Sequence, residues 1–293
     1  AGLHEGKCLS CAVNSRTAAE ERYDRIRPAK KQLNVLVAGG GPAGMKAAIT
    51  AFDRGHRVTL AEKTDKLGGL LKFTDYDDLK CDLMALKNYL VCQVEKRNIN
   101  VLFDTEVTKE FVNKGGFDAV IVAAGSSPAT PPVPGLKKAE HATTVYTKLE
   151  ALGKKVAVLG GGLVGCETGY FLYEKGHEVT IIEMQKEIAP EANWMHKEGM
   201  RQAFEASNIV TKTSHKVLSI EDGAVICEDA DGNEVKIEAD SVVYAMGMKP
   251  NSAVTDELEE SDVIDIIPVG DCLRPRKARQ AMEEGFWAAV NLI

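Results

Sequence analysis

Two copies of a glycine pattern stand out in the sequence because their spacing suits the binding of nucleotide phosphates. Each copy reads G-x-G-x-x-G and follows a short apolar run. The first glycine permits a tight turn, the second lets the backbone approach a pyrophosphate, and the third allows close packing of the next helix. That helix points free N–H groups and the positive end of its dipole at the phosphates. The positions are Gly39, Gly41 and Gly44 in the first copy, and Gly160, Gly162 and Gly165 in the second, 121 residues later.

An acidic residue follows each glycine pattern at the same distance. Glu62 ends residues 55–62, which read GHRVTLAE, and Glu183 ends residues 176–183, which read GHEVTIIE. A carboxylate at the end of the second strand of such a unit can accept hydrogen bonds from ribose hydroxyls. One glycine pattern alone could be an ordinary glycine-rich turn. Two copies with identical spacing, both with their acids, favour two dinucleotide sites.

Each copy also has the hydrophobic pattern of a strand–helix–strand unit. Apolar runs at 33–38 and 155–159 predict buried parallel strands, and a helical stretch at 45–54 follows the first glycine turn. Strands alternating with helices predict an α/β fold with two Rossmann-like domains. Further strands are expected at 98–103, 118–123, 208–212, 224–228, 234–238, 241–246 and 266–269, and a last helix at 278–292.

The composition excludes several classes of protein. A chain of 293 residues is long enough for two domains, and its net charge of −7 argues against a nucleic-acid partner. No apolar run reaches the length of a membrane span, so no membrane association is expected. The seven cysteines lack the spacing of a disulfide framework. That scatter favours a reducing, cytoplasmic location.

Two strand ends and one acidic residue favour a flavin at one of the sites. The strand at 118–123 runs into the small residues Ala124 and Gly125, and Gly247 has the matching place after the strand at 241–246. Asp271 follows a short strand and precedes the last helix. Its carboxylate there could bind the ribityl chain of FAD, or it could simply cap the helix.

These motifs together resemble a superfamily of two-dinucleotide flavoproteins that includes glutathione reductase and NADH oxidases. The resemblance spans about residues 32–293 and implies a discontinuous FAD-binding domain, 32–130 and 240–293, into which an NAD-binding domain, 131–239, is inserted. It implies an FAD site at Gly39, Gly41, Pro42, Ala43, Gly44, Glu62, Lys63, Gly69, Leu70, Val107, Ala124, Gly125, Gly270 and Asp271. It implies an NAD site at Gly160, Gly162, Leu163, Val164, Gly165, Glu183 and Gly247.

The same resemblance places Glu167 near the nicotinamide and the flavin. A buried helix carboxylate paired with a lysine would fit the sequence equally well. Glu183 favours NADH over NADPH, because its charge would repel a 2′-phosphate and neither Met184 nor Gln185 is an arginine that could accept one.

The sequence departs from the disulfide reductases of this superfamily. No Cys-x-x-Cys pair follows the first glycine turn or lies in the second domain. Cys166, beside the second glycine turn, has no partner nearby in the sequence, and we expect a packed core thiol. A mechanism that reduces a disulfide substrate is therefore disfavoured.

An N-terminal arm, residues 1–31, narrows the resemblance to NADH:flavin oxidoreductases related to 2,4-dienoyl-CoA reductase, enoate reductases and trimethylamine dehydrogenase. Residues 11–15, which read CAVNS, resemble the segment that supplies the last ligand of a 4Fe-4S cluster, with Ser15 in place of a proline. Cys11 is thus implied as one cluster ligand. Cys8 and Cys11 could also form half of a zinc site or a redox pair, but no second Cys-x-x-Cys exists to complete a zinc site.

The resemblance implies that the chain transfers hydride from NADH to FAD. In a parent protein the electrons would pass on to a 4Fe-4S cluster and FMN, groups that we do not expect in this chain, and would reduce an activated C=C bond. The expected partners are the FMN-barrel portion of that parent and a small-molecule electron acceptor. Because the chain starts at Ala1, shortly before Cys11, we expect a fragment with a loosely held arm. Two alternatives remain: a module that holds ADP, as in an amine dehydrogenase, and a non-catalytic redox sensor.

Overall fold

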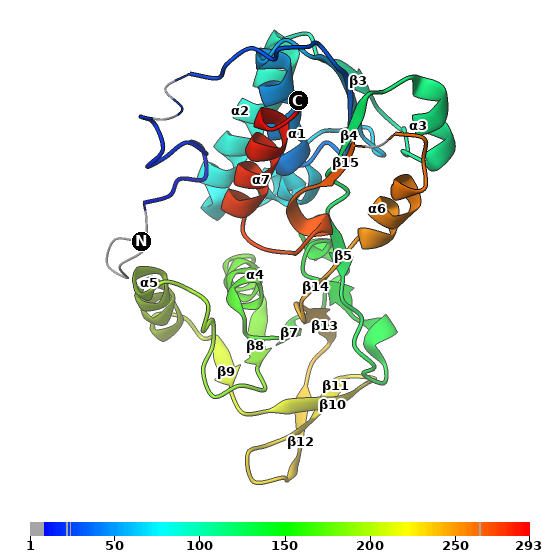
Figure 1. The fold of residues 1–293 in the computed structure, drawn as a ribbon. Helices are drawn as coiled ribbons and strands as arrows, with labels where there is room; N and C mark the ends of the chain where they lie inside the picture. The colour runs from blue at the N-terminus through cyan, green and yellow to red at the C-terminus, as the bar shows by residue number, and fades with distance from the viewer. Residues whose placement is uncertain (1–8, 22, 24, 264) are drawn as a thin grey trace. The chain divides into compact units, whose positions relative to one another are not determined.

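A computed structural model describes residues 9–21, 23, 25–263 and 265–293 (Figure 1). The strands are β1 (Asn34–Ala38), β2 (Arg57–Ala61), β3 (Asn100–Leu102), β4 (Ala119–Val122), β5 (Ser126–Pro128), β6 (Glu140–His141), β7 (Lys155–Leu159), β8 (Glu178–Ile182), β9 (Val210–Lys212), β10 (Lys216–Glu221), β11 (Ala224–Glu228), β12 (Glu234–Glu238), β13 (Ser241–Tyr244), β14 (Met248–Pro250) and β15 (Asp265–Pro268). The α-helices are α1 (Pro42–Asp53), α2 (Cys81–Lys96), α3 (Lys109–Gly115), α4 (Leu163–Glu174), α5 (Trp194–Glu205), α6 (Ser252–Glu259) and α7 (Ala278–Val290). Among the described residues, none of these helices has both the length and the apolar character needed to cross a bilayer.

The chain divides into two units, the first of which is built on a five-stranded sheet. This unit comprises residues up to 75, 80–127 and 248–293, and its parallel strands have the order β15-β4-β1-β2-β3. Helices α1, α2 and α7 cover one face of the sheet, where Met45, Leu90 and Met282 are buried (Figure 1). Helices α3 and α6 cover the other face, where Val112 and Leu258 are buried. The first unit is therefore a three-layer α/β structure.

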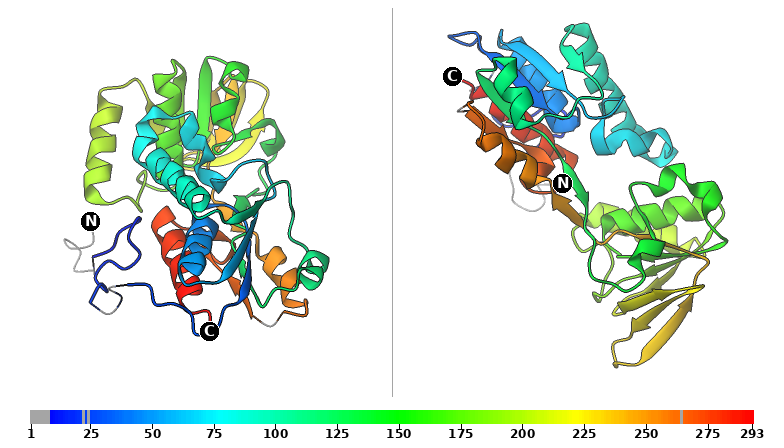
Figure 2. Two further views of the ribbon diagram at one scale, coloured as in Figure 1. Left: turned by 90° about the horizontal axis from the view of Figure 1, so that it is seen from above. Right: turned by 90° about the vertical axis from the view of Figure 1, so that its right-hand side faces the viewer.

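The second unit comprises residues 76–79 and 128–247 and contains the second glycine pattern. Its parallel strands have the order β6-β13-β7-β8-β9, and α4 packs against β7 and β8. Strands β10, β11 and β12 form a separate antiparallel sheet, drawn in yellow on the right of Figure 2. That sheet buries Ile220, Val225 and Ile237 in one core cluster with Ala157 and Ile182 of the parallel sheet.

The internal repeat reappears as matching strand pairs. In the first unit β1 pairs with β2 from Asn34↔Arg57 to Ala38↔Ala61. In the second unit β7 pairs with β8 from Lys155↔Glu178 to Leu159↔Ile182, the same register displaced by 121 residues. The parallel α/β fold with two Rossmann-like units that the sequence predicts is confirmed.

Two details differ from the expectations. Strand β13 pairs with β7 in the second sheet, so the chain returns to the first unit after Gly247 rather than at residue 240. Strand β10 was not expected, and β10–β12 pair antiparallel instead of joining the parallel layers. Only Ile220 among the β10 side chains is fully buried, which explains why the apolar pattern there is weak.

The described part of the N-terminal arm makes specific contacts with the first unit. The buried hydroxyl of Ser15 donates a hydrogen bond to the carbonyl oxygen of Met282 in α7. The ring of Tyr23 stacks edge-on against Trp287, with 4.7 Å between the ring centroids. How loosely the arm as a whole is held stays a prediction. Cys8 lies outside the described residues.

Candidate functional site

Two glycines of the first turn are required by backbone packing. Gly39, which follows β1, has φ of +111°, a conformation that disfavours side chains. A Cβ there would overlap the carbonyl oxygen of Ala123, and a Cβ at Gly44 would overlap the carbonyl oxygen of Gly39. The turn therefore brings the start of α1 against the ends of β1 and β4.

Gly41 differs from these two glycines because the protein itself leaves space beside it. It is the N-cap of α1, and among the described residues a Cβ built on it would meet only the Cα of Gly69, at an ordinary 3.8 Å. Gly69 has φ of +54° and lies against Gly41 from the loop that follows Glu62. Pro42 and Ala43 begin the helix. This arrangement forms an open cradle at a helix N-terminus, the geometry in which phosphates bind.

Glu62 is buried beside this cradle, with 6% of its surface exposed. One carboxylate oxygen accepts a hydrogen bond from the backbone N–H of Gly40 at 2.8 Å. The other accepts from the N–H of Thr64 at 2.9 Å and from its hydroxyl at 2.6 Å. The carboxylate therefore holds the glycine turn in place, a role beyond the ribose contact that the sequence predicts.

The second glycine turn repeats this geometry. Gly160 has φ of +97°, and a Cβ at Gly165 would overlap its carbonyl oxygen. Glu183 is 8% exposed and accepts hydrogen bonds from the N–H groups of Gly161 at 2.6 Å and Gln185 at 2.7 Å. The two repeats thus agree in backbone and in the hydrogen bonds of their buried acids.

The two turns differ at the helix that follows them. The N–H of Leu163, the first residue of α4, donates a hydrogen bond of 2.6 Å to the carboxylate of Glu191. The same oxygen lies 3.3 Å from a Cβ built on Gly162. In the first repeat the equivalent space faces Gly69, which has no side chain. A carboxylate oxygen therefore stands where the second turn would receive an anionic group.

Five of the other expected FAD residues have different environments in the first unit. Lys63 and Leu70 are exposed, whereas Val107 is buried in a core cluster that also contains the ends of β1 and β2. Ala124 and Gly125 follow β4, and their carbonyl oxygens accept hydrogen bonds from the side chain and the N–H of Asn251. All of the expected FAD residues lie in the first unit.

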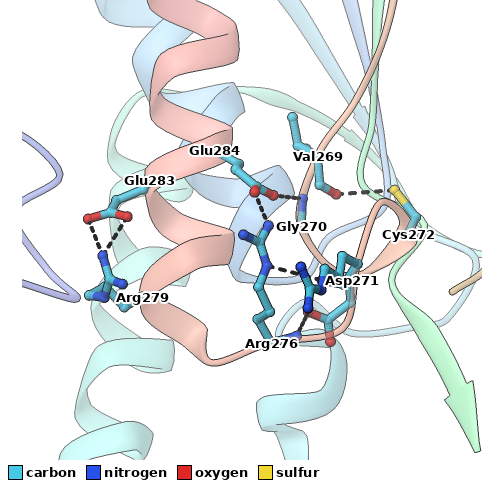
Figure 3. A network of polar contacts seen from close by, with 9 residues as sticks. Val269, Gly270, Asp271, Cys272, Arg276, Arg279, Glu283 and Glu284 are labelled. Carbon is cyan, nitrogen blue, oxygen red and sulfur yellow. Dashed lines mark hydrogen bonds and ion pairs between the residues drawn. The ribbon is translucent and has the colours of Figure 1, made fainter. Parts of the chain in front are cut away.

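Asp271 lies in a short turn after β15 that the structure holds from several sides (Figure 3). One carboxylate oxygen accepts a hydrogen bond from the hydroxyl of Ser126 at 3.2 Å, and the other accepts from the N–H of Arg276 at 3.2 Å. Burial raises the pKa of Asp271 above the usual range of aspartate, and these two hydrogen bonds oppose the rise. The N-cap of α7 is Lys277, so Asp271 is not the cap of that helix.

The expected NAD residues all lie in the second unit. Val164 is largely exposed on α4, and Gly247 has φ of +100°, matching Gly125 at +68° in the first unit. Glu167, on the same helix, is partly buried, and its carboxylate lies 3.4 Å from Nε2 of His196 on α5. The imidazole of His196 is thus one polar partner of the Glu167 carboxylate.

The cysteines that the sequence singles out have different environments. Cys166 is fully buried, and burial raises the pKa of its thiol to about 12, so it is the inert core thiol that we expected. Cys11 is partly exposed, and hydrogen bonds from the backbone N–H groups of Asn14 and Val13 lower the pKa of its thiol. Among the described residues, no three His, Cys, Asp or Glu side chains come together as a metal site.

Sequence reasoning missed several residues that shape these sites. Gly40 and Gly161 could have been found, because both repeats read Gly-Gly-Gly and a Cβ at either position would press on the buried acid. Glu191, Ser126 and Glu284 carry no comparable signal. Their contacts depend on segments that only the fold brings together.

Comparisons with known proteins support the similarity that the motifs indicate. The chain is 35% identical to an NADH oxidase of Thermoanaerobacter brockii over 97% of its own length and 44% of that protein. It is 33% identical to a cinnamate reductase of Clostridium sporogenes over 97% of its length and 43% of that protein. A solved structure of 2-naphthoyl-CoA reductase with 2-naphthoyl-CoA matches 97% of this chain and 44% of that one, with a TM-score of 0.90 and 32% identity.

The chain therefore spans less than half the length of these relatives. The expected resemblance to the FAD- and NAD-binding portion of the NADH:flavin oxidoreductases is confirmed. The family described as pyridine nucleotide-disulphide oxidoreductase matches residues 33–285. Since this match covers both glycine turns and the Asp271 turn, the chain belongs to the pyridine nucleotide-disulphide oxidoreductase family of flavoprotein oxidoreductases.

Proposed function

We propose that the first unit binds FAD, that the second binds NADH, and that the chain transfers hydride from NADH to FAD. The observation that carries this proposal is the repeated turn, in which a buried glutamate accepts the N–H of the middle glycine in both units. Only the first unit adds the Asp271 turn. A second acid there suits a longer cofactor with a ribityl chain.

The residues of the first unit fit FAD. The space beside Gly41 at the start of α1 suits a pyrophosphate, because among the described residues no side chain lies within 4 Å of a Cβ built there and none caps the first N–H groups of the helix. Glu62 would accept ribose hydroxyls. Asp271 would accept a hydroxyl of the ribityl chain.

The residues of the second unit also fit a nucleotide, although the carboxylate of Glu191 competes for the phosphate position. The N–H of Leu163 already binds an anionic oxygen, that of Glu191, so a pyrophosphate can take the same position once that side chain moves. Glu183 would accept the ribose 2′-hydroxyl and would repel a 2′-phosphate, which favours NADH. We assign Glu167 a place near the nicotinamide, where its pairing with His196 would orient the carboxylate.

The hydride transfer is chemistry that the two cofactors supply, and the protein positions them. The glycine turns hold the phosphates, and the buried acids hold the riboses. Holding both reactants in place lowers the entropic part of the barrier. The proposed hydride transfer requires no covalent bond to a protein side chain. The thiol of Cys166 agrees with this, because it is buried and protonated.

The activity of a longer parent protein is a further part of the proposal. Relatives of more than twice the matched length include reductases named for cinnamate and for 2-naphthoyl-CoA. We infer that the electrons pass through a 4Fe-4S cluster and FMN in an additional portion and reduce an activated C=C bond. The lowered pKa of Cys11 favours the thiolate, the form that binds iron, so Cys11 suits one ligand position of that cluster.

A second function is favoured by the Glu191 contact. A carboxylate on the first amide of α4 weakens the case for pyridine-nucleotide binding. In that case the chain would be a redox sensor without turnover, or a module that holds ADP at the first turn.

The test is the visible absorption of the purified chain and its response to NADH without oxygen. We expect a yellow protein whose flavin absorption is bleached by NADH. The variant Gly41→Val should crowd the pyrophosphate and purify without flavin. Gly199→Val is the matched control, because Gly199 lies exposed on α5 with open space around it. A yellow Gly41→Val protein would contradict the FAD site, and a colourless wild type that retains ADP would support the second function.

A further inference from the structure

Glu284 on α7 contacts both sides of the Asp271 turn with one carboxylate. One of its oxygens accepts a hydrogen bond of 2.7 Å from the N–H of Gly270, the residue before Asp271. The other oxygen accepts a hydrogen bond from the guanidinium of Arg276, and the backbone N–H of Arg276 donates to Asp271 (Figure 3). One side chain of α7 therefore links Gly270 to Arg276 across the Asp271 turn.

The opposite side of the turn is fixed to β4. The N–H of Val269 donates a hydrogen bond of 2.8 Å to the carbonyl oxygen of Val122. The buried thiol of Cys272 donates to the carbonyl oxygens of Val122 and Val269, each at 3.1 Å. Since burial raises the pKa of Cys272, this thiol keeps its proton. Asp271 lies between this fixed side and the side that Glu284 holds.

The position of Glu284 is itself set by the first glycine turn. The next residue, Gly285, lies so close to α1 that a Cβ there would overlap the carbonyl oxygen of Ala43. A Cβ at Gly270 would also press on Ala43, at 3.0 Å from its Cβ. The contact with the first turn of α1 thus fixes the position of α7, and in that position Glu284 lies against the Asp271 turn.

We propose that Glu284 is a positioning residue for flavin binding, which acts by clamping Gly270 and Arg276 so that Asp271 is held beside the start of α1. This inference rests on the proposed FAD site at the first glycine turn. Glu284 need not touch the cofactor. With its side chain 25% exposed and that of Arg276 33% exposed, the clamp is partly shielded from water, where charge-assisted hydrogen bonds are strong.

The adjacent Glu283 supplies a matched control. It forms two hydrogen bonds of 2.7 Å with Arg279 one helical turn earlier, at a similar exposure of 28%, and this pair lies apart from the Asp271 turn in Figure 3. Glu283→Gln removes the same charge from the same helix without releasing the turn. A general effect of helix stability or net charge would therefore be the same in both variants.

The experiment compares Glu284→Ala, Glu284→Gln and Glu283→Gln in the full chain. Hydrogen exchange of residues 270–276 without cofactor measures the clamp directly. The FAD dissociation constant and the visible circular dichroism of bound flavin measure its consequence. We expect faster exchange, a dissociation constant raised at least tenfold and an altered dichroism for Glu284→Ala. Partial recovery is expected for Glu284→Gln, whose amide oxygen can still accept from Gly270, and no change for Glu283→Gln.

Each other outcome overturns the inference in a distinguishable way. Unchanged exchange in both Glu284 variants would show that the clamp does not hold the turn, whether or not flavin binds. Faster exchange with unchanged flavin affinity and dichroism would show that the clamp does not serve the cofactor. Faster exchange together with a wild type that binds no FAD would locate the failure in the proposed FAD site. If Glu284→Ala fails to fold, Glu284→Gln carries the same comparison.

Discussion

Replacing Glu191 by glutamine should strengthen the binding of NADH. In the free protein this carboxylate accepts the N–H of Leu163 at the start of α4, where the proposed pyrophosphate would bind. The nucleotide must displace it and forgo its favourable interaction with the helix terminus. Glu191→Gln keeps the size of the side chain and removes the charge, so displacement costs less and repulsion of the phosphates disappears.

The size of the effect follows from the exposure of the contact. A charged hydrogen bond contributes about 1.5–3 kcal/mol when it is shielded, and a charge at a helix terminus about 0.3–1 kcal/mol. Glu191 is exposed, so the solvent competes for its carboxylate, and a value near 1 kcal/mol is appropriate. That free energy corresponds to a roughly fivefold lower dissociation constant.

The assay is an anaerobic titration with NADH or, to avoid reduction of the flavin, with NAD⁺ and calorimetry. Glu187→Gln is the control, because Glu187 lies on the same loop, pairs with Lys197 at 3.6 Å and gives the same change in net charge. We expect Glu187→Gln to bind like the wild type. An equal or weaker affinity for Glu191→Gln would refute the reasoning that this carboxylate competes with the nucleotide.

Three further predictions concern the other site residues. Met184 lies beside Glu183 and is 69% exposed, so an arginine there could bind a 2′-phosphate. Met184→Arg should therefore raise the kcat/KM for NADPH relative to that for NADH about tenfold, which corresponds to roughly 1.4 kcal/mol. An unchanged ratio in steady-state kinetics would contradict this. FAD affinity should weaken as the pH falls through the raised pKa of Asp271, because the protonated acid is a poorer acceptor, and Asp271→Asn should flatten that pH profile in a fluorescence titration. The chain alone should reduce dyes with NADH but leave an enoyl substrate unreduced, as product assays would show. Metal analysis should find no stoichiometric iron, because Cys11 gives one of the four thiolates that a 4Fe-4S cluster takes.

The fold was predictable because its signals are local. The distance from Gly39 to Glu62 and from Gly160 to Glu183 sets the length of one strand–helix–strand unit, and the identical spacing appears as identical strand register. The role of the buried acids was only partly predictable. Their hydrogen bonds to Gly40 and Gly161 arise because the end of the second strand lies beside the turn, a fact of the folded sheet.

Other contacts were not predictable because they join distant segments. Leu163 and Glu191 are 28 residues apart, and Ser126 and Asp271 are 145 residues apart. No pattern of residue types marks such a pair, since exposed glutamates and serines are common everywhere in a chain. The sequence thus predicted where the two glycine turns form, whereas the structure was needed to find which distant side chains contact them or the Asp271 turn.

The proposed assignment gives the difference between the two repeats a functional reason. Both turns share their glycines and acids, and they diverge where the following loop returns to the helix start, with Gly69 in the first and Glu191 in the second. A flavin that stays bound benefits from a phosphate site that no carboxylate of the described residues occupies. A coenzyme that must leave after each turnover benefits from a carboxylate that reoccupies the helix terminus, because this keeps its affinity moderate. We therefore expect the tighter NADH binding of Glu191→Gln to appear mainly as faster association, measurable by stopped-flow mixing, because the start of α4 is then accessible in a larger fraction of the free protein. A change confined to the dissociation rate would mean that Glu191 acts on the bound nucleotide and not by occupying the empty site.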